Sequence, residues 1–303
     1  MLVEEGNFSV AMMARLLHVS RSGYYSWKKR PRIDKWEQAK DEVKHCWLES
    51  DKRFGARFIQ IMLPHLTLYR VRKIMRELNI FGVVPKQKKR TTIPDKNAPL
   101  RPDLVKRDFT SPVPTYKLVG DITYLRTGAG WLFLATVIDL NTRMVVGWAL
   151  SERMMADIVI DALEMARRHG YVAENAIFHS DRGSQYTSRK LALWAKINHV
   201  RLSVGRTGSC HDNAVAESFF ATLKRYMYAE GKSYKTRLEA RNYVVEFIES
   251  FYNRRKPHTS IGNQIPAAAM KAFFERTRLA QEERCDEKET MESGSTKKVV
   301  QAA

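Results

Sequence analysis

The stretch from Lys117 to Ser151 constrains the fold of this 303-residue chain more than any other part of it. It contains three runs of apolar, β-branched and aromatic residues, at Lys117–Arg126, Trp131–Leu140 and Arg143–Ser151. Short turns separate these runs, and the first turn is rich in glycine. Runs of this composition joined by so few residues predict antiparallel hairpins, so we expect three neighbouring strands here.

A different pattern follows the third run. Helical periodicity is expected over about 154–169, 188–199 and 212–230, and short apolar runs predict two further strands over 175–179 and 200–204. Three antiparallel strands followed by helix, strand, helix, strand and helix is the order of a ribonuclease-H-like domain. We therefore predict an α/β domain with a mixed five-stranded sheet and helices on both of its faces.

A small all-α region precedes this domain. Residues 8–27 are expected to form two short helices around a tight turn, with His18 where a glycine often makes the turn and Ser20 as the cap of the second helix. This pattern resembles a helix-turn-helix, for which a helical hairpin without contact to a DNA groove is the alternative. Three more helices are expected over 34–50, 56–63 and 68–78.

The chain is strongly basic. Its 52 Lys and Arg residues against 33 Asp and Glu residues give a formal net charge of +19. This excess favours a polyanionic partner, nucleic acid before an anionic membrane, because no run of about 18 apolar residues is present. It also favours phosphate contacts by Arg72 and Lys73, on the outer face of the helix expected over 68–78, over the alternative of a merely solvated face.

The cysteines and the N-terminus indicate the compartment. Three cysteines are too few and too scattered for a disulfide framework or a zinc site. The first residues include Glu4 and Glu5 rather than the basic start and apolar core of a secretory signal. We therefore expect a cytoplasmic protein without a membrane partner, associated with the nucleoid when it is bound to DNA.

Composition divides the chain into four parts. Residues 1–82 are expected to form a helical DNA-binding region, and residues 113–276 the ribonuclease-H-like core with a C-terminal helix. Residues 83–112 form a basic, proline-rich linker that could follow a phosphate backbone, and the charged residues 277–303 are expected to be flexible. The linker side chains expected to contact phosphate are Lys86, Lys88, Lys89 and Arg90.

Three carboxylates stand where this fold could bring them together. Asp121 lies within the first expected strand, Asp181 just after the fourth, and Glu217 near the start of a long helix. Two hard cations about 4 Å apart, held by carboxylates, can activate an oxygen nucleophile and stabilise the leaving oxygen when a phosphodiester is broken. Mg²⁺ suits such a site, because it needs few acidic ligands and takes water and phosphate as the others.

Each acid also has a purely structural interpretation. Asp181 could be a turn residue, and Glu217 could simply favour a helix N-terminus. Asp121 fits such an interpretation least, because an unpaired carboxylate in an apolar strand is costly to bury. Two competing acids are interpreted structurally, Asp139 as a hairpin-turn residue and Asp212 as a helix cap.

Several residues around the acids are candidate DNA contacts. Lys224 lies two helical turns after Glu217 on nearly the same face, so it could hold a phosphate beside the metal ions. Asn213 could border the site or cap the helix. A zinc site at His179 and His211 is not favoured, because no Cys or His partners stand at ligand spacing. Further residues that could line a DNA channel are Gln185, Arg254 and Arg255.

The motifs that contain the three acids are distinctive when taken together. They are VGDITYL, HSDRGSQYTS and GSCHDNAVAESFFATLK, accompanied by WLFLATVIDLNTRMVVGWAL and FYNRRKPHTSIG. In these motifs, and in the 35 residues between Asp181 and Glu217, the chain resembles the D-D-E transposases of bacterial insertion sequences. The resemblance is specifically to the OrfB product of the IS-three family, whose core is similar to retroviral integrases, and it extends from about Phe8 to Met270.

The resemblance implies that Asp121, Asp181 and Glu217 form a metal-binding catalytic triad. It implies hydrolytic nicking at the element's end, then attack of the freed 3′-hydroxyl on another DNA strand. Mg²⁺ is the implied cofactor, with Mn²⁺ able to substitute and two ions bound when DNA is present. The implied partners are the terminal inverted repeats, target DNA, further copies of the chain on DNA, and an upstream OrfA-type protein joined by frameshifting.

The chain departs from the family pattern at two positions before the first acid. Leu118 stands where the family usually has Trp, and Gly120 where it often has Thr. Neither is a ligand, so we expect changed packing and not lost activity. Two other functions fit a similar fold: a ribonuclease H or junction resolvase that cuts without joining, and a helix-turn-helix regulator with an inactive core. The basic N-terminal third disfavours the first, and the presence of all three acids disfavours the second.

Overall fold

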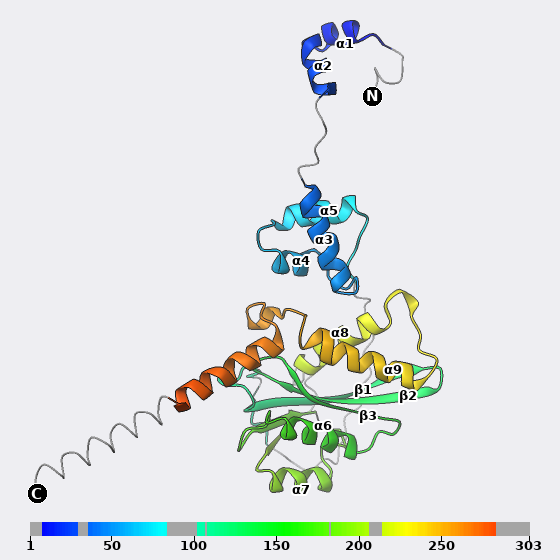
Figure 1. Cartoon of the computed structure of the whole chain (residues 1–303). Coiled ribbons are helices and arrows are strands. Elements are labelled where there is room, and N and C mark those ends of the chain that lie inside the picture. Colours follow the sequence, from blue (N-terminus) through cyan, green and yellow to red (C-terminus); the bar gives the residue numbers. More distant parts are fainter. Residues whose placement is uncertain are drawn as a thin grey trace, which may run out of the picture.

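A computed structural model describes residues 8–29, 36–83, 102–106, 108–181, 183–205 and 214–282 (Figure 1). Several sequence predictions concern residues outside these ranges. They are the linker contacts Lys86, Lys88, Lys89 and Arg90, the residues His211, Asp212 and Asn213 before the long helix, and most of the tail at 277–303.

The centre of the chain forms one five-stranded sheet. Its strands are β1 (Lys117–Thr127), β2 (Gly130–Asp139), β3 (Val145–Ser151), β4 (Ile177–Ser180) and β5 (Arg201–Val204). In space they follow the order β3-β2-β1-β4-β5. The β1–β2 and β2–β3 pairs are antiparallel, whereas the β1–β4 and β4–β5 pairs are parallel. This order confirms the predicted ribonuclease-H-like mixed sheet.

The turn between β2 and β3 is longer than predicted, so β3 begins at Val145 and not at Arg143. The fully buried Asp139 carboxylate accepts hydrogen bonds from the main-chain N–H groups of Thr115 and Thr142, each at 2.7 Å. Arg143 follows in the left-handed backbone region, with a φ of 62°. Asp139 is therefore the hairpin-turn residue that the sequence predicts, but the prediction of a shorter turn between the two strands was wrong.

Helices cover both faces of the sheet (Figure 1). They are α6 (Asp157–Arg168) and α7 (Arg189–Ile197) on one face, and α8 (Ala214–Met227) and α9 (Arg237–Val245) on the other. Because side chains alternate along a strand, Leu118 of β1 packs into the α6–α7 core, whereas Val119 packs into the α8–α9 core. Strands β1, β2 and β3 thus each contribute to both hydrophobic cores.

Gly120 allows β1 and β4 to pack closely on the α6–α7 side. A Cβ atom at position 120 would collide with the ring of Phe178, which is almost fully buried. The Phe178 ring therefore fills the space that a side chain at position 120 would need.

Gly120→Ala is expected to destabilise the fold by about 1–3 kcal/mol, because overpacking forces the Phe178 ring or the strand to move. Denaturant unfolding would measure the change. Gly55→Ala is the matched control, because a Cβ atom there meets nothing within 4 Å. Both substitutions lower the conformational entropy of the unfolded chain, so Gly55→Ala controls for that effect. The free energy of unfolding of Gly55→Ala should stay within about 1 kcal/mol of the wild-type value. A Gly120→Ala protein as stable as this control would contradict the packing argument.

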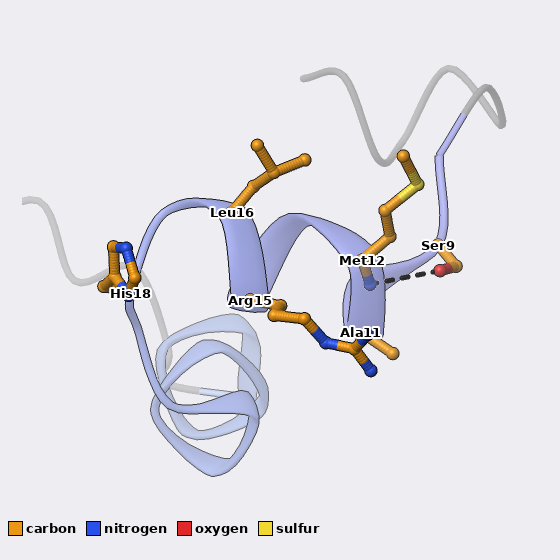
Figure 2. A pocket seen from close by; sticks show the side chains of 6 residues that line it. All are labelled: Ser9, Ala11, Met12, Arg15, Leu16 and His18. Carbon is orange, nitrogen blue, oxygen red and sulfur yellow. Dashed lines mark hydrogen bonds between the residues drawn. The ribbon is translucent and has the colours of Figure 1, made fainter.

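The first two helices enclose the predicted tight turn. They are α1 (Val10–Leu16) and α2 (Arg21–Lys29). His18 adopts the left-handed backbone with a φ of 53°, and Ser20 Oγ accepts a hydrogen bond from the Gly23 N–H at 2.8 Å. The turn and the cap of the second helix therefore form as predicted. Figure 2 shows the shallow groove along α1, which is lined by Ser9, Ala11, Met12, Arg15, Leu16 and His18.

The next three helices form a small unit over residues 36–83. They are α3 (Glu37–Glu49), α4 (Ala56–Met62) and α5 (Leu68–Glu77). Thr67 caps α5, as predicted, by accepting a hydrogen bond from the Arg70 N–H at 3.3 Å. The apolar residues of this unit are continuous with the α8–α9 core, and Figure 1 shows the unit beside those helices. The helical unit and the sheet domain therefore share one hydrophobic core.

Arg53 anchors this unit on the sheet domain. Its side chain is only 9% exposed, and its two terminal nitrogens donate to the Glu246 carboxylate at 3.0 and 3.4 Å. The guanidinium carbon lies 4.4 Å from the centre of the Phe251 ring and 5.7 Å from that of Tyr243. Arg255 adds a second connection, because it donates to the Glu49 carbonyl at 2.9 Å. A charged anchor inside an aromatic cage thus joins the segment between α3 and α4 to the C-terminal helices.

The predicted single helix over 233–253 is shorter and changes type. α9 begins at Arg237, after Thr236 as its cap, and continues as the π-helix η2 (Glu246–Tyr252). The buried Asn253 side chain follows, and its Oδ1 and Nδ2 atoms pair with the N–H and the carbonyl of Val145, each at 3.0 Å. Asn253 therefore binds the β3 main chain as a neighbouring strand would. A further helix covers 266–282.

Candidate active site

The parallel β1–β4 pair brings Asp121 and Asp181 together. Val119 pairs with His179, and each acid lies two residues further along the chain from its member of this pair. Burial, followed by the neighbouring charge of Asp181, raises the pKa of Asp121 to about 8. Burial also raises the pKa of Asp181. The two carboxylates therefore share a region of low solvent access, where like charges oppose ionisation.

One main-chain group orients each of these carboxylates. The Ile122 N–H donates to Asp121 Oδ1 at 2.8 Å, and the Gly183 N–H donates to Asp181 Oδ1 at 3.0 Å. A Cβ atom on Gly183 would lie 3.1 Å from both Asp181 Oδ1 and Gln185 Oε1. The tight turn after β4 therefore places Gln185 near Asp181.

Glu217 lies in the first turn of α8, over the face of the sheet to which Asp121 points. Its side chain is exposed, and its charge contributes to the raised pKa of Asp121. Within the ranges that the structure describes, no three Asp, Glu, His or Cys side chains converge closely enough to hold one metal ion. The three predicted acids thus face one region, but their oxygen atoms do not form a closed coordination shell.

Thr136 is a site residue that sequence reasoning missed. It lies on β2 directly opposite Asp121, so the two side chains point to the same face of the sheet. Its hydroxyl oxygen is buried and has no hydrogen-bond partner among the described residues. Two carboxylates with one main-chain donor each and an unpartnered hydroxyl form an oxygen-rich, negatively charged site. This donor set suits a hard divalent cation with its bound water.

Tyr186 is a second missed residue. It is 2% exposed, its ring packs against Phe178 at 6.2 Å between centroids, and burial raises the pKa of its hydroxyl well above the ordinary value. The charges of Asp121 and Asp181 raise this pKa further, so the ring forms one wall of the acidic region. Only its place in the QYTS part of the motif could have indicated this role.

The predicted DNA contacts differ in their surroundings. Lys224 lies on α8 with its Nζ atom 4.7 Å from the centre of the Tyr124 ring, and its charge lowers the pKa of Asp121. Arg254 is exposed, whereas Arg255 donates to the Ser250 and Glu49 carbonyls and contacts Glu246. On α5, Arg72 and Lys73 are both exposed, and Lys73 Nζ lies 4.4 Å from the Trp36 ring centre.

His179 has a structural role. It is 2% exposed, its Nδ1 atom forms a hydrogen bond with Ser203 Oγ at 2.8 Å, and its ring meets Phe109 edge-on. The Ser203 contact joins β4 to β5, and the Phe109 contact joins β4 to the segment before β1, so both pack His179 into the fold.

Comparison with known proteins places the chain in a family. Two models described as integrase core domain match residues 112–210 and 198–266. The transposase InsF of insertion sequence IS3A from Escherichia coli K12 is 36% identical over 274 residues, which cover 86% of this chain and 94% of the relative. A 31 kDa protein of insertion element IS600 from Shigella sonnei is 33% identical over 270 residues, which cover 87% and 99%.

The chain therefore belongs to the IS-three family of transposases and has an integrase-like core. Among solved structures, the HTLV-2 integrase catalytic core domain in complex with magnesium has a TM-score of 0.39 at 12% identity. That match covers 51% of this chain and 95% of the other. Because this TM-score is below 0.5, the fold assignment depends on the strand order and not on this likeness. None of the described helices has the length and apolar character needed to cross a membrane.

Proposed function

We propose that this chain is the catalytic transposase of an insertion sequence. It nicks DNA at the ends of the element and joins the freed 3′-hydroxyl to another DNA strand. The observation that carries this proposal is the juxtaposition of Asp121 and Asp181 on the parallel β1–β4 pair, with Glu217 on the helix above the same face. The family relationship supports the same chemistry.

Asp121, Asp181 and Glu217 are the residues that would hold Mg²⁺, or Mn²⁺ in its place, with two ions when DNA is bound. When bound, the ions would activate a water molecule or the DNA 3′-hydroxyl as the nucleophile and would stabilise the leaving oxygen. The Ile122 and Gly183 N–H groups keep one oxygen of each aspartate oriented. Thr136 provides a hydroxyl for a water molecule in the same region.

DNA is the partner that the basic surface and the family both support. Lys224 and Gln185 are proposed contacts near the acids. Arg254, the α5 residues Arg72 and Lys73, and the α1–α2 hairpin are proposed contacts elsewhere along the DNA. Residues 1–82 serve as the DNA-binding region, 83–112 as a linker and 113–276 as the core. The helix over 266–282 continues past residue 277, where the sequence predicts that the tail begins. Several copies of the chain act together on the two element ends, with an OrfA-type protein as a further partner.

Product analysis tests this proposal. Purified protein is incubated with Mg²⁺ and labelled DNA that carries the ends flanking its own gene. A transposase yields nicked ends first and joined, branched products afterwards. A ribonuclease H or junction resolvase would yield cleaved DNA without joined products, and a DNA-binding regulator would yield neither. Either of the last two results would contradict the proposed function.

A further inference from the structure

Two large aromatic side chains are exposed on the β1–β2 hairpin. Tyr124 of β1 is 47% exposed and Trp131 of β2 is 49% exposed. Their ring centroids are 5.2 Å apart, and the ring planes are nearly perpendicular, at 85°. The residues pair diagonally across the two strands, because Tyr124 is opposite Phe133 and Trp131 is opposite Arg126. An exposed aromatic pair of this size leaves apolar ring faces in contact with water.

A lysine connects this pair to the acidic site. Lys224 Nζ lies 4.7 Å from the centre of the Tyr124 ring, and the lysine is on α8, the helix that also carries Glu217. Tyr124 follows Asp121 by three residues on the same strand, a distance of about 10 Å along an extended chain. Asp121 and Tyr124 leave β1 on opposite faces of the sheet, because side chains alternate along a strand. Lys224 therefore links the two, because it reaches the Tyr124 ring from the helix that carries Glu217.

The hairpin around the pair is held firmly from the α8–α9 side. The Tyr228 hydroxyl accepts a hydrogen bond from the Arg126 N–H at 2.8 Å and is 3.1 Å from the Arg126 carbonyl, to which it can donate. Arg237 Nε donates to the Trp131 carbonyl at 3.2 Å. The Gly128 N–H at the hairpin turn donates to the Tyr234 carbonyl at 2.7 Å. The hairpin is thus fastened by main-chain contacts, and the two exposed rings are not needed to close it.

We infer that Tyr124 and Trp131 form a stacking surface for an unpaired base of the DNA strand that lies in the active site, with Lys224 beside them for the adjacent phosphate. Aromatic faces next to a cation are typical of sites that bind single-stranded nucleic acid, since every base has a face on which a ring can stack. The surface would hold the end of the duplex open beside the acids. This inference rests on the proposed function only in taking DNA as the substrate.

The alternative is a cross-strand aromatic pair that only stabilises the hairpin. The two possibilities differ in what the rings do when single-stranded DNA is added. If the rings stack on a base, their removal weakens the binding of single-stranded DNA more than the binding of duplex DNA. If the pair only stabilises the hairpin, its removal weakens the binding of both forms equally.

Binding of fluorescein-labelled oligothymidine and of a duplex of equal length, measured without metal ions, distinguishes them. Tyr124→Ala and Trp131→Ala are each expected to weaken oligothymidine binding about tenfold and duplex binding less than about twofold. Tyr124→Phe should bind oligothymidine like the wild type, because it keeps the ring. Phe274→Ala removes an exposed aromatic ring elsewhere and serves as the matched control.

Tryptophan fluorescence provides an independent readout. Oligothymidine should quench the fluorescence of the wild type, and Trp131→Phe should remove most of that quenching. Unchanged oligothymidine binding in the two alanine variants, or an equal loss of single-strand and duplex binding, would overturn the inference. The assay involves no catalysis, so a failure of strand transfer would leave its result intact.

Discussion

Asp121→Asn is expected to raise the melting temperature of the metal-free protein at pH 8. The Asp121 side chain is half-buried beside Asp181 and Glu217, and burial is the largest cause of its raised pKa of about 8, against an ordinary 3.8. A group with a folded pKa above its unfolded pKa destabilises the fold as the pH rises through that interval. Asparagine removes the charge and can still accept the Ile122 N–H. The gain should be roughly 1–3 kcal/mol at pH 8 and should vanish near pH 4.

Mg²⁺ should stabilise the wild type but not Asp121→Asn. An ion that binds only the folded state stabilises it in proportion to the logarithm of its concentration. We expect millimolar Mg²⁺ to raise the melting temperature of the wild type and to leave that of Asp121→Asn almost unchanged. Asp157→Asn is the control, because Asp157 is an exposed acid paired with Lys190 at 2.9 Å. Equal Mg²⁺ responses in wild type and Asp121→Asn would contradict a metal site at this residue.

Arg53→Met is expected to release the helical unit at 36–83 from the sheet domain. Methionine keeps apolar contact with Phe251 and Tyr243 but removes both hydrogen bonds to Glu246. Breaking a buried ion pair costs about 3–5 kcal/mol, and the cost here should be roughly 2–4 kcal/mol because Glu246 is 39% exposed and can be hydrated. Hydrogen exchange should increase in α3–α5 and remain unchanged in β1 and β2.

Arg255→Ala tests whether the effect belongs to the buried anchor. Arg255 contacts the same Glu246 carboxylate at 3.3 Å and donates to the Glu49 carbonyl of α3 at 2.9 Å, but its side chain is 41% exposed. Solvent screens such a pair, so the loss should be about 1 kcal/mol or less. If Arg53→Met and Arg255→Ala increased exchange in α3–α5 to the same extent, the special role of Arg53 would be wrong.

Local patterns in the sequence predicted most of the core fold. The three β-rich runs and their short turns gave the antiparallel hairpins, and the later alternation gave the parallel strands. The caps at Ser20 and Thr67 were predictable because each hydrogen bond spans three residues. The buried Asp139 was predictable as a turn residue for the same reason, since Thr142 is its partner.

Contacts between distant segments were not predictable in this way. Arg53 and Glu246 are 193 positions apart, and Asn253 and Val145 are 108 positions apart. No periodicity or motif in either segment indicates its partner. The role of Thr136 was missed for a related reason, because only the β1–β2 register places its hydroxyl opposite Asp121.

The acids themselves were found from their motifs, and the sheet explains why two of them meet. Because β1 and β4 pair in parallel, Val119 lies beside His179, although 60 positions separate them in the chain. Asp121 and Asp181 each follow two residues later, in the same register. Glu217 depends instead on how α8 lies over the sheet. Sequence alone could name this residue but could not predict its exposure.

Strand transfer by Asp181→Ala tests the central claim most directly. The assay uses Mg²⁺, labelled element ends and a binding measurement on the same preparations, with Asp157→Ala as the control for loss of an exposed acid. We predict that Asp181→Ala binds the ends like the wild type and forms no joined product above background, whereas Asp157→Ala joins normally. Joining by Asp181→Ala at the wild-type rate would contradict the assignment of the three acids.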